Sequence, residues 1–276
     1  MGETTGISWA QATWNPWQGC RKLSPACRNC YMYRDMERYG KDPRDVRRSK
    51  TTFNTPLTWK EPKLIFTCSW SDWFIEEADA WRDEAWDIIR RTPHHTYQIL
   101  TKRTERIADR LPPDWPLKNA WLGASVETDS YRQRITELCA VPATVHFLSC
   151  EPLLAHLHLE EPVSGPTQGG IHPPWYIQQG IDWIIGGGES GPNARPTNPD
   201  WARSLRDQAI RAGIPFHWKQ WGEWAPSYFG EQTWEPTETT PHHYFEDHPC
   251  RVWRIGREKS GRLLDGVLWD QMPQGR

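Results

Sequence analysis

Short apolar runs alternate with longer amphipathic segments along this chain of 276 residues. Each run is rich in apolar and β-branched residues and is bounded by polar or turn residues, a pattern typical of buried strands. The pattern predicts seven strands, within residues 12–19, 63–70, 96–103, 120–127, 144–152, 182–190 and 215–224.

The segments between the later strands have the 3–4 residue spacing of helices. We predict helices within residues 75–91, 129–140 and 198–213. The last has Asn198 as a predicted N-cap, followed by a proline at the first helical position, and Gly213 as a predicted C-terminal stop.

Strand followed by helix, repeated, predicts an α/β protein with parallel strands and right-handed crossovers. We predict a (β/α) barrel, full or partial, with six to seven parallel strands. In this interpretation residues 1–224 form the barrel, with a cysteine loop at 19–31 and an inserted loop at 160–180 that is rich in Pro, Gly and Gln. Residues 225–276 are predicted to be an irregular C-terminal extension packed on the barrel.

Charged residues recur at or just past the ends of the predicted strands, about one strand-helix unit apart. In a β/α barrel these ends converge on one rim, which is where active sites lie. Some of these residues are alternatively expected to cap the following helix. The set is Asp72, Lys102, Glu127, Glu151, Glu189 and Lys219.

Three of the seven cysteines fall within eleven residues, with the spacing C-x6-C-x2-C: Cys20, Cys27 and Cys30. Three interpretations stay open. One is structural zinc, which needs a fourth ligand such as Cys68, Cys150 or a histidine. The second is inert buried cysteine, and the third is a 4Fe–4S cluster held by three thiolates, which leaves one iron without a protein ligand.

Composition and charge indicate where the protein is located and how it could bind nucleic acid. The sequence has no long apolar run and no secretory leader, so we expect a cytoplasmic protein outside the membrane, where clustered cysteines more often bind metal than form disulfides. The net charge is −2, so binding to nucleic acid would require a local cluster of positive residues. Candidates are the Lys/Arg runs at 44–50 and 101–106; the alternative is a solvated face. Nineteen tryptophans fill the core or, near loops, stack on a planar substrate: Trp14, Trp17, Trp70, Trp73, Trp221 and Trp224.

A loop after the first strand of a β/α barrel, with three cysteines ending in C-x2-C and the aromatic Tyr31 beside the last, resembles the radical S-adenosylmethionine (SAM) superfamily. The superfamily's commoner spacing is C-x3-C-x2-C, so the six-residue gap is a departure. Blocks over about residues 7–270 resemble, in order, a phage- and prophage-associated three-cysteine-motif family regarded as radical-SAM-like: TWNPWQGCRKLSPACRNCY, SWSDWF, ILTKR, WLGASVE, FLSCEPLL, WIIGGGESGPNARP, KQWGEW and GRLLDGVLWD.

The resemblance implies that Cys20, Cys27 and Cys30 ligate three irons and that the fourth chelates SAM. A reduced cluster would then cleave SAM to a 5′-deoxyadenosyl radical. A cation is needed near the SAM carboxylate, for which Lys102 or Arg103 are the candidates. The remaining assignments follow position: Ser69, Ser71 and Asp72 at the SAM amino group, Gly187, Gly188 and Glu189 at the adenine, ribose or amine, and Glu127, Glu151, Arg195 and Lys219 along the rim. Cys150 is a candidate hydrogen-atom donor, or else a small buried thiol.

The leading hypothesis is a radical SAM enzyme acting on a nucleic acid base or nucleotide, in DNA modification or repair. It implies an external electron donor and, as a further expectation, a protein partner. One alternative is a non-catalytic zinc or iron–sulfur module in a nucleic-acid-processing complex. Another is a radical SAM enzyme acting on a peptide or small metabolite.

Overall fold

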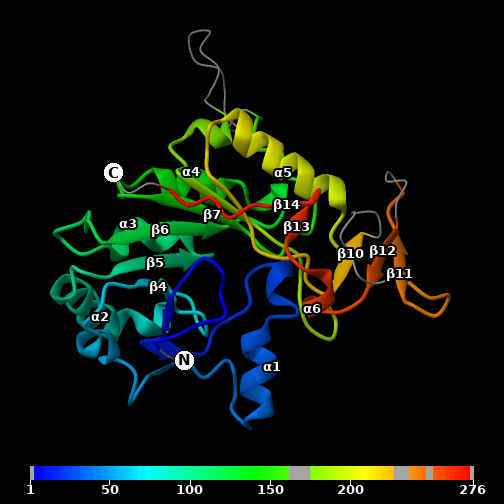
Figure 1. Cartoon of the computed structure of the whole chain (residues 1–276). Helices are drawn as coiled ribbons and strands as arrows, with labels where there is room; N and C mark the ends of the chain where they lie inside the picture. Colours follow the sequence, from blue (N-terminus) through cyan, green and yellow to red (C-terminus); the bar gives the residue numbers. More distant parts are fainter. Residues whose placement is uncertain (1–2, 162–174, 227–235, 247–250, 274–276) are drawn as a thin grey trace. The chain divides into compact units, whose positions relative to one another are not determined.

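Seven strands form one sheet of the computed structural model, which describes residues 3–161, 175–226, 236–246 and 251–273 (Figure 1). The strand order is β1-β4-β5-β6-β7-β8-β9, and chain order is kept throughout. The pairs β1–β4, β4–β5, β5–β6 and β8–β9 are parallel. The predicted α/β class and the partial (β/α) barrel are therefore confirmed.

Each strand of this sheet falls inside a segment that the apolar pattern predicts. The bounds are β1 Ala12–Trp14, β4 Leu64–Thr67, β5 Thr96–Thr101, β6 Ala120–Ser125, β7 His146–Cys150, β8 Trp183–Gly186 and β9 Phe216–Trp218. Every residue of β6, β7, β8 and β9 is buried, as expected for strands covered on both faces.

The three predicted helices are present, each shorter than the predicted segment. They are α2 Asp79–Arg91, α4 Gln133–Cys139 and α5 Pro199–Arg211. Asn198 accepts a hydrogen bond from the backbone N–H of Asp200 at 2.9 Å, so it is the N-cap of α5. Gly213 has φ of +68°, the left-handed geometry that ends the helix.

Several short elements add to the predicted set or subdivide it. Trp17–Gln18 is a separate strand inside the predicted segment 12–19, and the 3₁₀ turns Glu76–Ala78 and Asp129–Tyr131 lie inside the predicted helical segments 75–91 and 129–140. The helix α1 Tyr31–Arg38 begins directly after Cys30, and β2 Trp17–Gln18 pairs antiparallel with β3 Arg47–Arg48. The others are α3 Ile107–Arg110 and the 3₁₀ turns Pro25–Cys27, Thr55–Thr58, Glu76–Ala78, Thr104–Arg106, Asp129–Tyr131 and Tyr176–Gln178.

The described part of the C-terminal extension contains small antiparallel sheets. One has the order β10-β12-β11, from Trp224–Pro226, Arg251–Arg254 and His242–Tyr244. After α6 Arg257–Ser260, the strands β13 Leu263–Leu264 and β14 Val267–Leu268 form a hairpin. Asp265 and Gly266 both have positive φ, as a two-residue type I′ turn requires.

The chain divides into two compact units, which we describe separately. The first comprises Met1–Ser125, Arg134–Phe147 and Gln274–Arg276, and the second comprises Val126–Gln133 and Leu148–Pro273. The predicted domain boundary at residue 224 stays a prediction, and most of the predicted insertion at 160–180 lies outside the described residues. Among the described helices, none is long and apolar enough to cross a membrane.

Tryptophans fill the core of the first unit. The ring of Trp73 lies 5.8 Å from that of Trp14, 5.1 Å from that of Trp17 and 4.9 Å from that of Trp86, and all four side chains are buried. In the second unit Trp221 is buried against Trp218, with ring centroids 4.9 Å apart. These tryptophans pack against other rings, which is the packing interpretation of their abundance.

Candidate metal centre and strand-end residues

The cysteine loop starts at a position where only glycine fits. Gly19 has φ of +94°, and a Cβ there would lie 2.5 Å from the carbonyl oxygen of Asp45. Its N–H donates to the carbonyl of Trp70 at 3.0 Å, and the N–H of Cys20 donates to the carbonyl of Pro43 at 2.8 Å. The backbone that presents Cys20 is therefore fixed from two sides.

The other two cysteines lie on consecutive short turns. Pro25 begins a 3₁₀ turn that ends at Cys27, whose N–H donates to the carbonyl of Ser24 at 2.9 Å. Cys30 is the residue before α1. Burial raises the pKa of Cys30, while the backbone N–H groups of Met32 and Tyr33, which point at its sulfur, oppose that shift.

The three thiols influence one another electrostatically. Burial raises the pKa of Cys20 to about 12, with a further rise from Asp72 and smaller ones from Cys27 and Cys30. All three are free and partly exposed. Thiolates are the ligands that iron–sulfur clusters take, so the chemistry of these three side chains suits such a cluster.

In the described ranges no three His, Cys, Asp or Glu side chains are grouped so that they could hold a metal ion, and this includes the three cysteines of the loop. Cys68, one of the fourth ligands considered for zinc, is buried, and desolvation raises its pKa well above the ordinary value, with smaller rises from Asp72 and Cys20.

Asp72 and Arg103 join the cysteine loop to the ends of β4 and β5. One carboxylate oxygen of Asp72 accepts from the hydroxyl of Thr101 at 2.7 Å and from the N–H of Phe74 at 3.0 Å. The other accepts from the N–H of Lys102 at 2.9 Å and lies 3.2 Å from Nη1 of Arg103. This buried carboxylate is thus satisfied within the first unit.

The guanidinium of Arg103 is also buried, and it reaches the cysteine loop. Its Nη1 lies 3.8 Å from Sγ of Cys20, and its Nη2 donates to the carbonyl of Arg21 at 3.1 Å. The charge of Lys102 is one of the influences that lower the pKa of Cys30. Both candidate cations therefore act on the cysteines.

The loop after β4 holds the cysteine loop through serines and an asparagine. The hydroxyl of Ser71 donates to the carbonyl of Gly19 at 2.5 Å. Asn15 donates to the hydroxyl of Ser69 at 2.9 Å and accepts from the N–H of Trp70 at 2.7 Å, and the hydroxyl of Tyr31 donates to the carbonyl of Ser69 at 2.6 Å. The sequence pattern did not identify Asn15. The one signal in the sequence was its position directly after the apolar end of a strand.

In the second unit, Glu151 forms an ion pair at the end of β7. Nζ of Lys219 lies 2.8 Å from its carboxylate, and the amide of Gln220 donates to it at 3.4 Å. A Cβ at Gly187 would lie 3.3 Å from the carboxyl carbon of Glu151. Two predicted rim residues, Glu151 and Lys219, are therefore neighbours of Gly187, which is predicted to approach SAM.

Glu189 forms a second ion pair in this unit. Arg195 donates to it from its backbone N–H at 2.8 Å, from Nε at 2.8 Å and from Nη2 at 2.6 Å. The backbone around it is closely packed, because a Cβ at Gly188 would lie 2.0 Å from the carbonyl oxygen of Trp221. The glycines of the GGGES segment are thus needed for chain packing as well as for any ligand.

Cys150 and Glu127 are buried together. Burial raises the pKa of Cys150, and the charge of Glu127 raises it further. Cys150 therefore keeps its S–H proton, the state that a hydrogen-atom donor requires; the role itself stays a prediction.

The predicted site residues thus fall into two groups. The first unit brings together the three cysteines, Ser69, Ser71, Asp72, Lys102 and Arg103. The second unit brings together Glu151, Gly187 and Lys219, places Glu189 with Arg195, and buries Cys150 beside Glu127.

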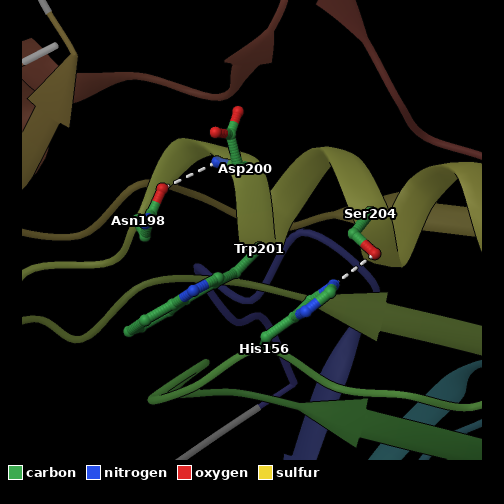
Figure 2. Close-up of a pocket in the computed structure, with 5 residues that line it drawn as sticks. All are labelled: His156, Asn198, Asp200, Trp201 and Ser204. Carbon is green, nitrogen blue, oxygen red and sulfur yellow. Dashed lines mark hydrogen bonds between the residues drawn. The ribbon is translucent and has the colours of Figure 1, made fainter. Parts of the chain in front are cut away.

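A cavity of about 290 Å³ lies in the second unit, and none of the predicted site residues lines it (Figure 2). It lies beside the first turns of α5, and Nε2 of His156 is 2.7 Å from the hydroxyl of Ser204. Burial lowers the pKa of His156, and the nearby His158 lowers it further. The lining residues are His156, Asn198, Asp200, Trp201 and Ser204.

The fold and the first-unit cluster define a partial (β/α) barrel with a three-cysteine loop after its first strand. The chain belongs to the family described as "Protein of unknown function (DUF5131)", whose profile matches residues 4–273. No curated protein matches the sequence.

Among solved structures the chain is similar to variants of spore photoproduct lyase. One shares 12% identity at a TM-score of 0.47, over 94% of this chain and 73% of that one. Another, with bound AdoMet and dinucleoside spore photoproduct, shares 11% identity at a TM-score of 0.43, over 88% and 68% of the two chains. At these values the likeness carries no argument about function.

Proposed function

We propose that this protein is an iron–sulfur enzyme of the radical SAM type. The observation that carries the proposal is the set of three cysteines on one loop, Cys20, Cys27 and Cys30, after the first strand of a partial (β/α) barrel. Cys20, Cys27 and Cys30 would hold a 4Fe–4S cluster and leave one iron for SAM. When bound, the reduced cluster supplies the electron that cleaves SAM to a 5′-deoxyadenosyl radical.

The chain's own residues would position this group. Arg103 brings a positive charge to the sulfur of Cys20, and Lys102 adds a second cation near Cys30. Negative charge gathers where thiolates and a SAM carboxylate meet, so these cations favour binding. Ser69 and Ser71 hold the loop, while Asp72 orients Arg103.

The second-unit residues are proposed to serve the nucleoside part of SAM and the substrate. Gly187 and Gly188 allow close backbone approach, and Glu189 is an acceptor for ribose or amine. Glu127, Glu151 and Lys219 are proposed rim residues, and Cys150 is the proposed hydrogen-atom donor. The supporting observations are their strand-end positions and, for Cys150, its protonated thiol.

We propose a nucleic acid base or nucleotide as the substrate, in DNA modification or repair. The basic character of the residues around the cysteines supports this choice. A non-catalytic zinc or iron–sulfur module, and a radical SAM enzyme for a peptide or small metabolite, are the alternatives. Phage association, cytoplasmic location, an external electron donor and a protein partner stay predictions.

Anaerobic purification tests the proposal. The protein should be brown and contain about four irons per chain, and with a reductant and SAM it should release 5′-deoxyadenosine. Colourless protein with one zinc per chain would support the module instead. An intact cluster with no 5′-deoxyadenosine, after trials with single-stranded and duplex DNA, would remove the SAM chemistry.

A further inference from the structure

Positive charge is concentrated in one segment of the first unit. Residues 21–50 contain ten lysines and arginines against four aspartates and glutamates, so the segment has a formal charge of +6. The whole chain has a charge of −2, which leaves −8 for the remainder. A local excess of positive charge of this size attracts polyanions to the segment.

Half of these cations are neutralised within the chain. Arg21, Arg34, Arg44, Arg47 and Arg48 form ion pairs with carboxylates. In the part of the chain that the structure describes, the others have no ion pair: Lys22, Arg28, Arg38, Lys41 and Lys50. All five are exposed, so their charge is available to a ligand.

Exposed aromatic rings are interleaved with these cations. The side chain of Tyr39 is 67% exposed and lies between Arg38 and Lys41, and that of Tyr31 is 42% exposed and follows Cys30. Cations that follow a backbone, together with rings that stack on bases, are how proteins bind single strands of nucleic acid.

We propose that residues 21–50 form a binding surface for single-stranded nucleic acid beside the cysteine loop. The surface contains Cys27 and Cys30, so a strand bound there lies next to the proposed cluster. The inference rests on the proposed function, because it names the surface that would present the substrate to the cluster. Binding of the strand is measured independently of iron content.

The test is fluorescence anisotropy with a labelled single-stranded oligonucleotide at several salt concentrations. The triple variant Arg28→Gln, Arg38→Gln, Lys41→Gln should lose at least tenfold in affinity at low salt. The slope of log K against log salt should become less steep by about 2, because each phosphate contact with a single strand contributes about 0.7. Tyr39→Ala should weaken binding about fivefold or more.

A matched triple variant controls for net charge: Lys60→Gln, Lys118→Gln, Lys259→Gln, all exposed and outside the segment. It should bind as the wild type does. Equal weakening by both triples, or binding only to anionic phosphatidylserine vesicles or to polyglutamate, would overturn the proposal. Iron is quantified on the same samples, so strand binding by iron-free protein would refute the proposed function and leave the surface standing.

Discussion

The guanidinium of Arg103 contacts two side chains, with Nη1 3.2 Å from the carboxylate of Asp72 and 3.8 Å from the sulfur of Cys20. Both side chains of the ion pair are buried, so neither charge is compensated by water. Because Asp72 is tied to β5 by Thr101, the pair fixes the position of Cys20 relative to that strand.

Arg103→Gln should therefore destabilise the first unit and reduce cluster retention. Removing one partner of a buried pair costs about 3–5 kcal/mol. Arg103→Lys keeps the positive charge but cannot make the forked contacts of a guanidinium. It should therefore retain more iron than Arg103→Gln and less than the wild type. Urea unfolding and iron per chain measure the two effects. Arg90→Gln is the control, since its pair with Asp114 is at the surface and should contribute under about 1 kcal/mol. Equal effects of Arg103→Gln and Arg90→Gln would contradict this prediction.

Cys27→Ala should leave the barrel folded and lose most of the iron, because the residue lies on a loop and only three thiols are proposed as ligands. Circular dichroism and iron analysis check this. Cys139→Ala, a change at a partly exposed cysteine outside the loop, should keep the wild-type iron content. Iron loss in both variants would indicate nonspecific instability, while retention in Cys27→Ala would remove Cys27 from the ligand set.

Glu189→Gln should retain iron and weaken SAM binding. The structure adds a cost in stability, since Gln replaces a buried carboxylate that accepts three hydrogen bonds from Arg195. Equilibrium dialysis with SAM separates the two roles when compared with Arg195→Gln. If both variants lower the unfolding midpoint and leave SAM affinity unchanged, Glu189 is structural only.

Two adjacent glycines should respond very differently to alanine. A Cβ at Gly188 would lie 2.0 Å from a backbone oxygen of Trp221, which cannot move independently, so Gly188→Ala should destabilise by several kcal/mol, about the upper range for single changes. At Gly187 the nearest atom belongs to the side chain of Glu151 at 3.3 Å, so that variant should cost about 1 kcal/mol or less. Thermal unfolding of the two variants checks the order, which similar midpoints would contradict.

The sequence predicts the sheet well because each strand has a local signal. The runs that become β6 and β7 are mostly apolar, and every residue of the two strands is buried. Asn198 and Gly213 act on the backbone next to them, so the ends of α5 are also predictable. The helix α1 is not predicted, since its stability depends on the two buried methionines Met32 and Met36 and not on a clear apolar stripe.

The site is only partly predictable, because spacing identifies chemical groups but not their partners. The cysteine spacing and the strand-end positions predict which side chains matter. The sequence pattern cannot reveal that Arg103 contacts Cys20, or that the carboxylate of Asp72 accepts a hydrogen bond from Thr101 of β5. Both contacts join residues that are distant in sequence. The cavity at His156 has no motif at all, as its lining comes from a loop and the first turns of α5.

A buried histidine should make stability depend on pH in the acid range. Burial lowers the pKa of His217 to about 4, with Arg262 and Lys219 also lowering it and Asp270 opposing. Nη2 of Arg262 lies 3.2 Å from Nε2 of His217, and a guanidinium only donates, so Nε2 is the unprotonated acceptor and Nδ1, 3.4 Å from Asp270, carries the proton. A second proton on His217 would have to bind Nε2, where it would be repelled by the positive guanidinium of Arg262.

The sign of the effect follows from the two pKa values of His217. In the unfolded chain the ordinary pKa is 6.5, so between pH 6.5 and 4 the unfolded state binds a proton that the folded state does not. The free energy of unfolding should fall by roughly 3 kcal/mol as the pH drops from 6.5 to 4. Above pH 6.5 His217 is neutral in both states, so this loss of stability is absent there. His217→Gln should flatten that part of the profile, measured by urea unfolding at half-unit steps, whereas the exposed His243→Gln should leave it unchanged. A profile that keeps its slope in His217→Gln would show that other groups account for the acid sensitivity.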